Sequence, residues 1–324
     1  MRPDDVIGST DVDDSGLEQR PRQGRGQVAR RATRIRVERC VALALGLATF
    51  ASIVVLAYVR WRRGGGEATP APAIVGCTLL GERGPTGLPE YRHDASGLTL
   101  VLLAGGEFEM GDPGGDFDAM WRHRVRVSPF LISKYEVSRA DWTRVMGIAP
   151  SAPYADDSLP VANVSWFECE RYCRETGLDL PTEAQWEYAC RSGKQTAFGY
   201  GEQLRRDQAN CANTSDPDGL VAVDSFPPTS FGLHNMHGNV AEWCKDGYDT
   251  DAYDRRAVQV NVDPFVAPSG NEPRVVRGGD QGTPAGACLC GYRSSCAPQT
   301  PYYGTGFRPV LNLHVGTKTA RSEE

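Results

Sequence analysis

The chain has few histidines and no excess of basic residues. It contains 5 histidines in 324 residues, and 41 acidic side chains against 35 lysines and arginines give a net charge of -6. This balance argues against nucleic acid as a partner, because binding to phosphates requires clustered positive charge. His234 and His237 are three residues apart, but two histidines without a third ligand are a weak indication of a metal site. We therefore expect them to be exposed or hydrogen-bonded loop residues.

Internal repeats are absent, and one long region lacks periodicity. Residues 200–274 are rich in glycine, proline, asparagine and aspartate, without a helical or strand pattern. A structureless loop of this length is uncommon in a compact domain. Bound ions or disulfides would fix such a backbone.

The N-terminal part combines an arginine-rich arm with an apolar segment. Residues 1–39 contain eight arginines after residue 19 and almost no large apolar side chain, so we expect this arm to be disordered. Residues 40–59 include only two clearly polar side chains, and at about 1.5 Å per residue a helix of this length spans a bilayer core. We predict a transmembrane helix over 40–60. A cleaved signal peptide is disfavoured by the long arm and by the arginines that follow.

The flanking charges predict how the chain crosses the membrane. Five arginines lie at 30–39 and three at 60–63, which places the N-terminus in the cytoplasm by the positive-inside rule. The protein is then single-pass, with its main domain periplasmic or extracellular. Residues 61–95 are expected to be a flexible tether and connector, 96–315 the folded domain and 316–324 a polar tail.

Short signals mark the regular elements of the folded part. The apolar run 98–103 predicts a buried strand, and the alternation over 125–128 predicts a second. A hydroxyl residue followed three positions later by an acid or amide predicts a helix start. Such pairs are Ser138 with Asp141, Ser165 with Glu168, and Thr182 with Gln185, and two of these helices are expected to stop at Gly177 and Gly193.

Oxygen donors gather in the stretch 233–246. The Asn235 amide, the carbonyls of Gly238 and Val240 and the Glu242 carboxylate could converge from one tight loop. Hard cations such as calcium take ligands of this kind, backbone carbonyls included. The alternative is a turn at Gly238 followed by a short helix that begins at Glu242.

This stretch belongs to a wider set of sequence blocks. Gly-Asn-Val-Ala-Glu-Trp at 238–243 is followed by Arg-Gly-Gly at 277–279 and Gly-Phe-Arg at 306–308. Upstream lie Gly-Gly-Glu-Phe-Glu-Met-Gly at 105–111, Tyr-Glu-Val-Ser at 135–138, Pro-Val-Ala-Asn-Val-Ser-Trp at 160–166 and Leu-Pro-Thr-Glu-Ala-Gln-Trp-Glu-Tyr-Ala at 180–189. In this order the blocks resemble the formylglycine-generating enzyme, or sulfatase-modifying factor, family.

The resemblance implies a fold and two calcium sites. The fold is α+β with little regular secondary structure, a large calcium-stabilised variant of the C-type-lectin-like fold. The first implied site uses Asn235, Gly238, Val240 and Glu242. The second uses Asn210, the carbonyls of Cys211 and Leu220, and Asp218, although the segment is short and Asp216 competes with Asp218. A solvated acidic turn is the alternative for this second site.

Cysteine usage indicates an oxidising compartment. Eight of the ten cysteines lie in the domain, and eight allow 105 connectivities. The resemblance implies one disulfide, between Cys190 and Cys290. It also implies a partner for Cys173 after Arg308, but Pro309 stands there, so that bridge is absent or rerouted, with Cys296 as a candidate.

Active members of the family bind copper(I) through two cysteines five residues apart and convert a substrate cysteine to formylglycine with oxygen. Thiolates are soft ligands that select copper(I). Here Thr283 stands where the first cysteine belongs, Cys288 where the second does, and Asp280 replaces a serine. Cys288 and Cys290 are the candidate catalytic pair. On a strand both sulfurs would face one side. A disulfide or buried thiols are the alternative.

Two functions follow from the resemblance. The first is a membrane-anchored copper-dependent oxidoreductase that acts on an exported sulfatase or another peptide, with Arg293 as a substrate contact. The second is a catalytically silent, calcium-stabilised binding or sensing module on the same scaffold, since one fold supports unrelated functions. Maturation of a siderophore chromophore, as in some periplasmic relatives, stays open.

Overall fold

The computed structural model describes residues 71–81, 86–112, 122–150, 155–212, 219–256, 259–302 and 304–313. All of them belong to one compact unit, Ala48–Glu324, whereas the other unit, Met1–Leu47, lies outside the described residues. The predicted transmembrane segment and the polar tail also lie outside them. Within the described ranges no helix has the length and apolar character needed to cross a bilayer.

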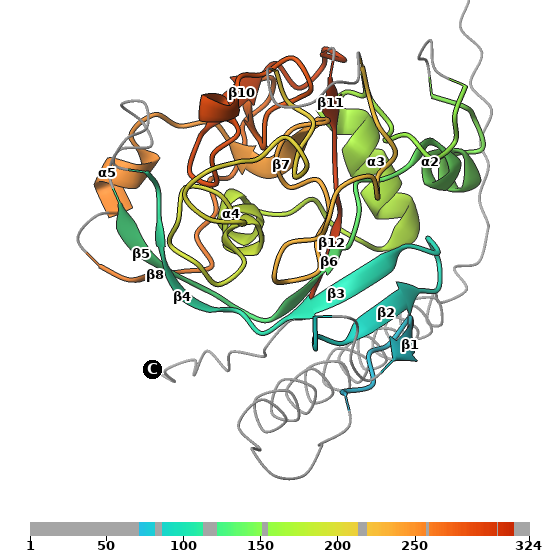
Figure 1. Cartoon of the computed structure of the whole chain (residues 1–324), viewed down its shortest axis with the longest axis horizontal. Coiled ribbons are helices and arrows are strands. Elements are labelled where there is room, and N and C mark those ends of the chain that lie inside the picture. Colours follow the sequence, from blue (N-terminus) through green and yellow to red (C-terminus); the bar gives the residue numbers. More distant parts are fainter. Residues whose placement is uncertain are drawn as a thin grey trace, which may run out of the picture. The chain divides into compact units, whose positions relative to one another are not determined.

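The largest sheet joins the first described strands to the last one (Figure 1). Its order is β1 (Cys77–Gly81), β2 (Glu90–His93), β3 (Thr99–Leu103), β6 (Phe130–Ser133) and β12 (Val310–Asn312), and every pairing is antiparallel. The strand predicted over 98–103 is β3. Its residues Leu100 to Leu103 are at most 1% exposed, as expected for an unbroken apolar run.

Part of the segment expected to be a connector is folded. β2 pairs with β3, so that Tyr91 lies opposite Leu100, and β1 continues the sheet beyond β2. Tyr91 is buried and its hydroxyl donates a hydrogen bond to the Pro72 carbonyl at 2.6 Å. The folded part therefore begins before residue 96. The apolar alternation in β2 covers only two buried positions, which is too short to be recognised in the sequence.

Two smaller sheets complete the strands. One contains β4 (Gly106–Met110), β5 (His123–Val127) and β8 (Asn261–Val262), and β5 alternates buried and exposed residues as predicted around 125–128. The other has the order β10 (Ser294–Cys296), β9 (Arg274–Arg277), β7 (Ala241–Gly247) and β11 (Thr305–Gly306). Glu242 therefore lies on a strand, and the alternative of a helix starting there is wrong.

The three predicted helix starts are confirmed. α2 (Arg139–Met146), α3 (Trp166–Thr176) and α4 (Glu183–Arg191) each have both hydrogen bonds of a capping box. α3 ends at Gly177 as predicted, but the left-handed residue that ends α4 is Ser192, one position before Gly193. Among the residues that the structure describes, the other helical elements are α5 (Ala252–Arg256) and the 3₁₀ turn η1 (Ala285–Ala287).

Irregular chain surrounds a central helix. The region expected to be irregular, 200–274, is so only in its first half. Between Arg191 and Ala241 the described residues form nothing more regular than isolated bridges, whereas β7, α5 and β8 lie in the second half. α4 lies at the centre of the domain (Figure 1) and contacts β4, β5, β7 and β9. Its Trp186 is fully buried. The result is a mixed fold with few helices, in which α4 and β7 hold the side chains described next.

Candidate functional site

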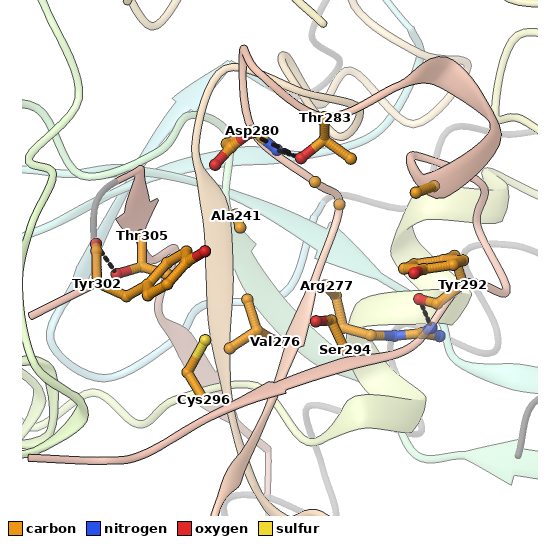
Figure 2. A pocket seen from close by; sticks show the side chains of 13 residues that line it. Ala241, Val276, Arg277, Asp280, Thr283, Tyr292, Ser294, Cys296, Tyr302 and Thr305 are labelled. Carbon is orange, nitrogen blue, oxygen red and sulfur yellow. Dashed lines mark hydrogen bonds between the residues drawn. The ribbon is translucent and has the colours of Figure 1, made fainter. Parts of the chain in front are cut away.

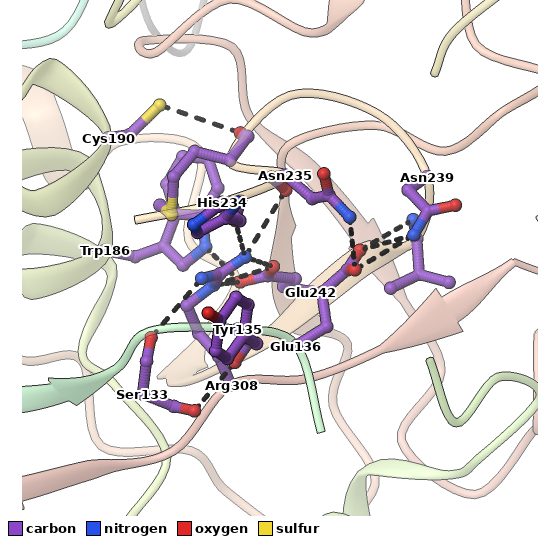
Figure 3. Close-up of polar contacts among 12 residues, drawn as sticks. Ser133, Tyr135, Glu136, Trp186, Cys190, His234, Asn235, Asn239, Glu242 and Arg308 are labelled. Atoms are coloured by element: carbon purple, nitrogen blue, oxygen red, sulfur yellow. Dashed lines mark hydrogen bonds and ion pairs between the residues drawn. The ribbon is translucent and has the colours of Figure 1, made fainter. Parts of the chain in front are cut away.

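A buried ion pair fixes the stretch that contains Glu242. The Arg308 Nε lies 2.8 Å from both Glu242 carboxylate oxygens, and its Nη2 lies 2.7 Å from Oε1 (Figure 3). Trp186 Nε1 donates to Oε2 at 2.7 Å. Arg308 also donates to the carbonyls of His234 and Asn235, at 2.8 and 3.3 Å. Arg308 thereby ties the chain that leads into β12 to the Glu242 carboxylate on β7.

A second buried carboxylate, Glu136, faces the asparagines of this loop (Figure 3). Its Oε2 accepts hydrogen bonds from the side-chain amides of Asn235 and Asn239, both at 2.9 Å, and its Oε1 accepts one from Val240 N at 3.3 Å. Burial and the charge of Glu242 raise the pKa of Glu136 to about 8, although Arg308 and the two amides oppose the shift. Glu136 has no arginine or lysine in direct contact among the described residues.

One predicted calcium ligand has a buried oxygen without a hydrogen-bond partner. The buried Asn235 Oδ1 has no hydrogen-bond partner, and an orphaned oxygen of this kind suits a cation. In contrast, both oxygens of Glu242 are taken by Arg308 and Trp186. Glu136 is likewise hydrogen-bonded, to Asn235, Asn239 and Val240, but it has no ion-pair partner among the described residues. The calcium site at 235–242 therefore stays a prediction.

The loop reaches this conformation through a close backbone approach. Gly238 has φ 75°, and a Cβ there would lie 2.1 Å from the Asn210 carbonyl oxygen. That oxygen accepts a hydrogen bond from Asn239 N at 2.7 Å. Asn210 is also a ligand of the second predicted calcium site. Its side-chain amide donates a hydrogen bond to the Gly219 carbonyl at 2.8 Å. Asp218, the carboxylate predicted there, lies outside the described residues, and the site with Cys211 and Leu220 stays a prediction.

The predicted substrate contact, Arg293, belongs to a buried charge network. It is 4% exposed, and its Nε and Nη2 lie 2.6 and 3.0 Å from the Glu183 oxygens. Its guanidinium lies over the ring of Tyr253, 4.3 Å from the centroid. Arg277 pairs with Glu187 in the same network. These contacts pack Arg293 between α4 and the segment that leads into β10.

The cysteines expected to form a disulfide lie together. The sulfurs of Cys190 and Cys290 are 3.1 Å apart as thiols, both fully buried. His237 joins them, and the ligand atoms of the three residues lie within 4.8 Å of one another. Burial raises the pKa of Cys290, but hydrogen bonds with Cys190 and His237 outweigh it and lower the pKa to about 5. Sequence spacing gave no sign that His237 accompanies this pair.

Cys288 and Cys290 do not form a pair with each other. They follow the 3₁₀ turn η1 and lie in a turn, whereas the expected shared face required a strand. Cys290 faces Cys190. Cys288 packs in a small buried cluster with Ala209 and Cys211, and its thiol hydrogen-bonds the Cys211 thiol.

A pocket of about 190 Å³ opens beside this turn (Figure 2). Asp280 lies at one end, with its Oδ1 accepting hydrogen bonds from the Thr283 hydroxyl at 2.7 Å and Gly282 N at 3.0 Å. Arg277 also lines the pocket, but Glu187 neutralises its charge. The lining residues come from β7, β9, β10, β11 and the turn: Ala241, Val276, Arg277, Gly278, Gly279, Asp280, Thr283, Ala287, Tyr292, Ser294, Cys296, Tyr302 and Thr305.

Comparison with known proteins now identifies the fold. The profile of the sulfatase-modifying factor enzyme 1-like domain matches residues 86–313, which is most of the described chain. The protein belongs to the sulfatase-modifying factor family. The formylglycine-generating enzyme of Bos taurus is 32% identical over 341 aligned residues, covering 76% of this chain and 90% of that protein.

The chain is also similar to part of a longer protein and to a solved structure of lower sequence identity. A serine/threonine-protein kinase, pkn1, of Chlamydia pneumoniae is 29% identical over 66% of this chain, and the match spans only 38% of that protein's length. The solved structure of PvdO from Pseudomonas aeruginosa has a TM-score of 0.59 at 24% identity and covers 74% of this chain. That likeness establishes the fold.

The pocket lies beside Thr283, the position at which the resemblance implies the first copper cysteine. Thr283 donates its hydroxyl to Asp280, where the resemblance implies a serine. Cys296 is the cysteine that lines the pocket, and burial together with Asp280 raises the pKa of its thiol. The pocket is therefore a cavity that could hold a ligand. Its Cys296 thiol stays protonated.

Proposed function

We propose that this sulfatase-modifying factor protein binds a ligand in the pocket beside Asp280 and does not oxidise thiols. The observation that carries the proposal is the position of Cys288. It stands at the second copper position, yet its thiol contacts Cys211, and Thr283 occupies the first position. Two thiolates that converge on one metal are needed to hold copper(I) in the way the family does.

The pocket chemistry favours a ligand with a cationic group. Asp280 is the charged group of the lining that no ion pair neutralises among the described residues. Tyr302 is 56% exposed and also lines the pocket (Figure 2). A carboxylate near tyrosine rings attracts an ammonium or guanidinium group by charge and by cation–π contact. A peptide with a lysine or arginine side chain carries such a group.

The wider setting is also part of the proposal. Residues 40–59 would anchor the chain in a membrane with the domain outside the cytoplasm. A calcium ion held by Asn235, the carbonyls of Gly238 and Val240 and the carboxylate of Glu136 would stabilise the irregular loop. The unpartnered Asn235 Oδ1 supports this arrangement.

Titration calorimetry with arginine amide and tetramethylammonium as probes tests the pocket. We expect both cations to bind, acetate not to bind, and Asp280→Asn to weaken cation binding about tenfold, which corresponds to ~1.4 kcal/mol. Asp251→Asn removes an exposed carboxylate elsewhere and is the matched control. Equal binding by the Asp280→Asn protein would show that the cation binds elsewhere.

The family activity is a second candidate, favoured by one observation. Cys190, His237 and Cys290 bring two sulfurs and a ring nitrogen together, and Cys290 has the lowered pKa of a metal-binding thiol. Copper(I) bound there would supply oxygen chemistry toward a substrate cysteine, as on an exported sulfatase. However, all three residues are buried and none lines the pocket.

A direct assay separates the two candidates. The protein is loaded with copper(I) and incubated in air with a peptide that contains a Cys-x-Pro-x-Arg core, and mass spectrometry detects the aldehyde product. We expect no conversion. Conversion that is lost in a Cys290→Ser variant would establish the oxidoreductase and contradict our proposal.

A further inference from the structure

We infer that Cys211 and Cys288 are joined by a disulfide in the mature protein, which cross-links the wall of the pocket to the irregular region before β7. This pair is separate from Cys190 and Cys290, and it does not depend on the ligand proposed above. The two bridges together would use both cysteines of the turn after η1, each with a different partner.

Backbone contacts hold the two cysteines side by side. Ala212, the neighbour of Cys211, donates its backbone N–H to the Thr283 carbonyl at 3.0 Å and bridges to Pro284. The chain then turns through η1, and Cys288, five residues after Thr283, packs against Cys211. The register of the backbone therefore places the sulfurs in contact before any covalent bond forms.

The surroundings of the two sulfurs suit a disulfide and not a metal ion. Cys211 and Cys288 are 1% and 0% exposed, in a cluster with Ala209 that Leu204 and Ala285 border. Besides Cys211, the Cys288 sulfur has the carbonyls of Thr283 and Pro284 within reach, at 3.8 and 3.6 Å. Two carbonyls offer no positive charge to stabilise a thiolate, and a metal ion requires thiolates. A disulfide is neutral and fits this apolar cluster.

A glycine makes room for the sulfur. A Cβ at Gly279 would lie 2.6 Å from the Cys288 Sγ, so a larger residue would displace it. Gly279 precedes Asp280, and it has a positive φ of 70°. The bridge would consequently sit directly behind the backbone that presents Asp280 to the pocket.

The bond forms by thiol–disulfide exchange with an external disulfide, either a disulfide-carrying oxidoreductase or oxidised glutathione. One cysteine thiolate attacks the external disulfide and releases one external thiol. The second cysteine then attacks the mixed disulfide, which releases the other external thiol and closes the bridge. The two protein thiols lose two protons and two electrons in total, and the external disulfide takes them up. Because both sulfurs are buried in the folded domain, exchange occurs while the chain is still folding.

Peptide mapping tests the bridge directly. The 324-residue protein is purified without reductant, its free thiols are alkylated, and it is digested with trypsin. The peptides 175–191, 207–245 and 278–293 contain Cys190, Cys211 and the pair at 288 and 290, respectively. We expect the three peptides to be linked in one cluster that separates on reduction.

Variants assign each link. In Cys211→Ser the peptide 207–245 should leave the cluster, whereas in Cys190→Ser the peptide 175–191 should leave it. The peptide 207–245 also contains Cys244, so Cys244→Ser is the matched control and should keep all three peptides linked. If a variant fails to fold, cleavage after Leu289 in the wild-type protein separates Cys288 from Cys290 and assigns the bridges without substitution.

Alkylated Cys211 and Cys288 in the folded protein would overturn the inference, as would a link from Cys211 to any other cysteine. Neither result bears on cation binding by Asp280, which calorimetry measures independently. In Cys190→Ser the peptides 207–245 and 278–293 should stay linked, and cleavage after Leu289 should leave Cys211 joined to the half that contains Cys288. That result would establish the bridge.

Discussion

The buried Glu242 carboxylate is neutralised by the guanidinium of Arg308. A bound cation or a neighbouring arginine could neutralise it, and in this structure Arg308 together with Trp186 occupies both of its oxygens. The predicted metal ligand is thereby part of an ion pair that links β7 to the chain before β12. Glu136, 106 residues earlier in the sequence, is left facing the asparagines of the loop.

Glu242→Gln should destabilise the protein strongly. The substitution leaves the Arg308 guanidinium buried without its ion-pair partner, which costs about 3–5 kcal/mol. Denaturant unfolding of wild type and variant measures the loss. Glu107→Gln is the control, because Glu107 pairs with Arg124 and Arg126 on an exposed strand face, and it should change stability little. Similar effects at both positions would contradict the ion-pair assignment.

Glu136 should make stability depend on pH in the neutral range. Its ordinary pKa is 4.5 and burial raises it to about 8 in the folded protein. Between these values the unfolded chain has lost a proton that the folded protein retains, so the free energy of unfolding falls as pH rises. The stabilisation is complete below pH 4.5 and lost as pH passes about 8.

Glu136→Gln isolates this contribution. Chemical unfolding in the presence of a chelator should show a shallower decline in stability from pH 4.5 to about 8 for the variant than for wild type. Asp246, whose pKa burial raises to about 7, contributes the same sign in both proteins and cancels in the comparison. Added calcium should stabilise wild type most at the upper end of this range, where Glu136 ionises, and should stabilise the variant less. Identical curves would exclude Glu136 as the titrating group and as a cation ligand.

At the scale of elements, the helices depend on local capping and the sheets on distant partners. Ser165 accepts a hydrogen bond from Glu168 N, and the Glu168 carboxylate accepts one from Ser165 N at 2.8 Å. These bonds lie within four residues, which is why the three helix starts could be read from the sequence. β1 and β2 had no comparable local signal, and their place in the sheet follows from pairing with β3.

Ser165→Ala should destabilise the domain by about 1 kcal/mol, because the N–H of Glu168 loses its acceptor at the start of α3. Thermal or denaturant unfolding measures this change. Ser165→Thr keeps a hydroxyl that accepts from Glu168 N and donates to the Glu168 carboxylate, and it should remain close to wild type. A full loss in the threonine variant would mean that Ser165 acts through packing and not through the cap.

At the scale of the whole molecule, the family and the mixed fold could be predicted, whereas the site could be predicted only in part. The blocks from Gly105 to Arg308 carry enough of the family pattern to identify the scaffold. The pairing of Cys288 with Cys211 depends on a 3₁₀ turn and on backbone contacts between distant loops, neither of which leaves a spacing pattern. Likewise, the proximity of Glu136 to Asn235 is created by folding alone.

The proposed anchor gives a prediction for the entire chain. Detergent phase separation should place the 324-residue protein in the detergent phase, and deletion of residues 1–63 should move it to the aqueous phase. Replacing two apolar residues of 40–59 by arginine is the matched control in the intact chain and should have the same effect as the deletion. Recovery of the unaltered chain in the aqueous phase would refute the anchor.

The place of β12 has a consequence for when the domain can finish folding. This strand pairs with β6, with Val310 opposite Ile132, and Asp179 exchanges two backbone hydrogen bonds with Val310. A chain is synthesised from its N-terminus, so one edge of the first sheet stays unpaired until residues 310–312 emerge. A chain that stops short of these residues would leave the β6 edge without its partner strand, and we expect it to be less stable than the whole domain.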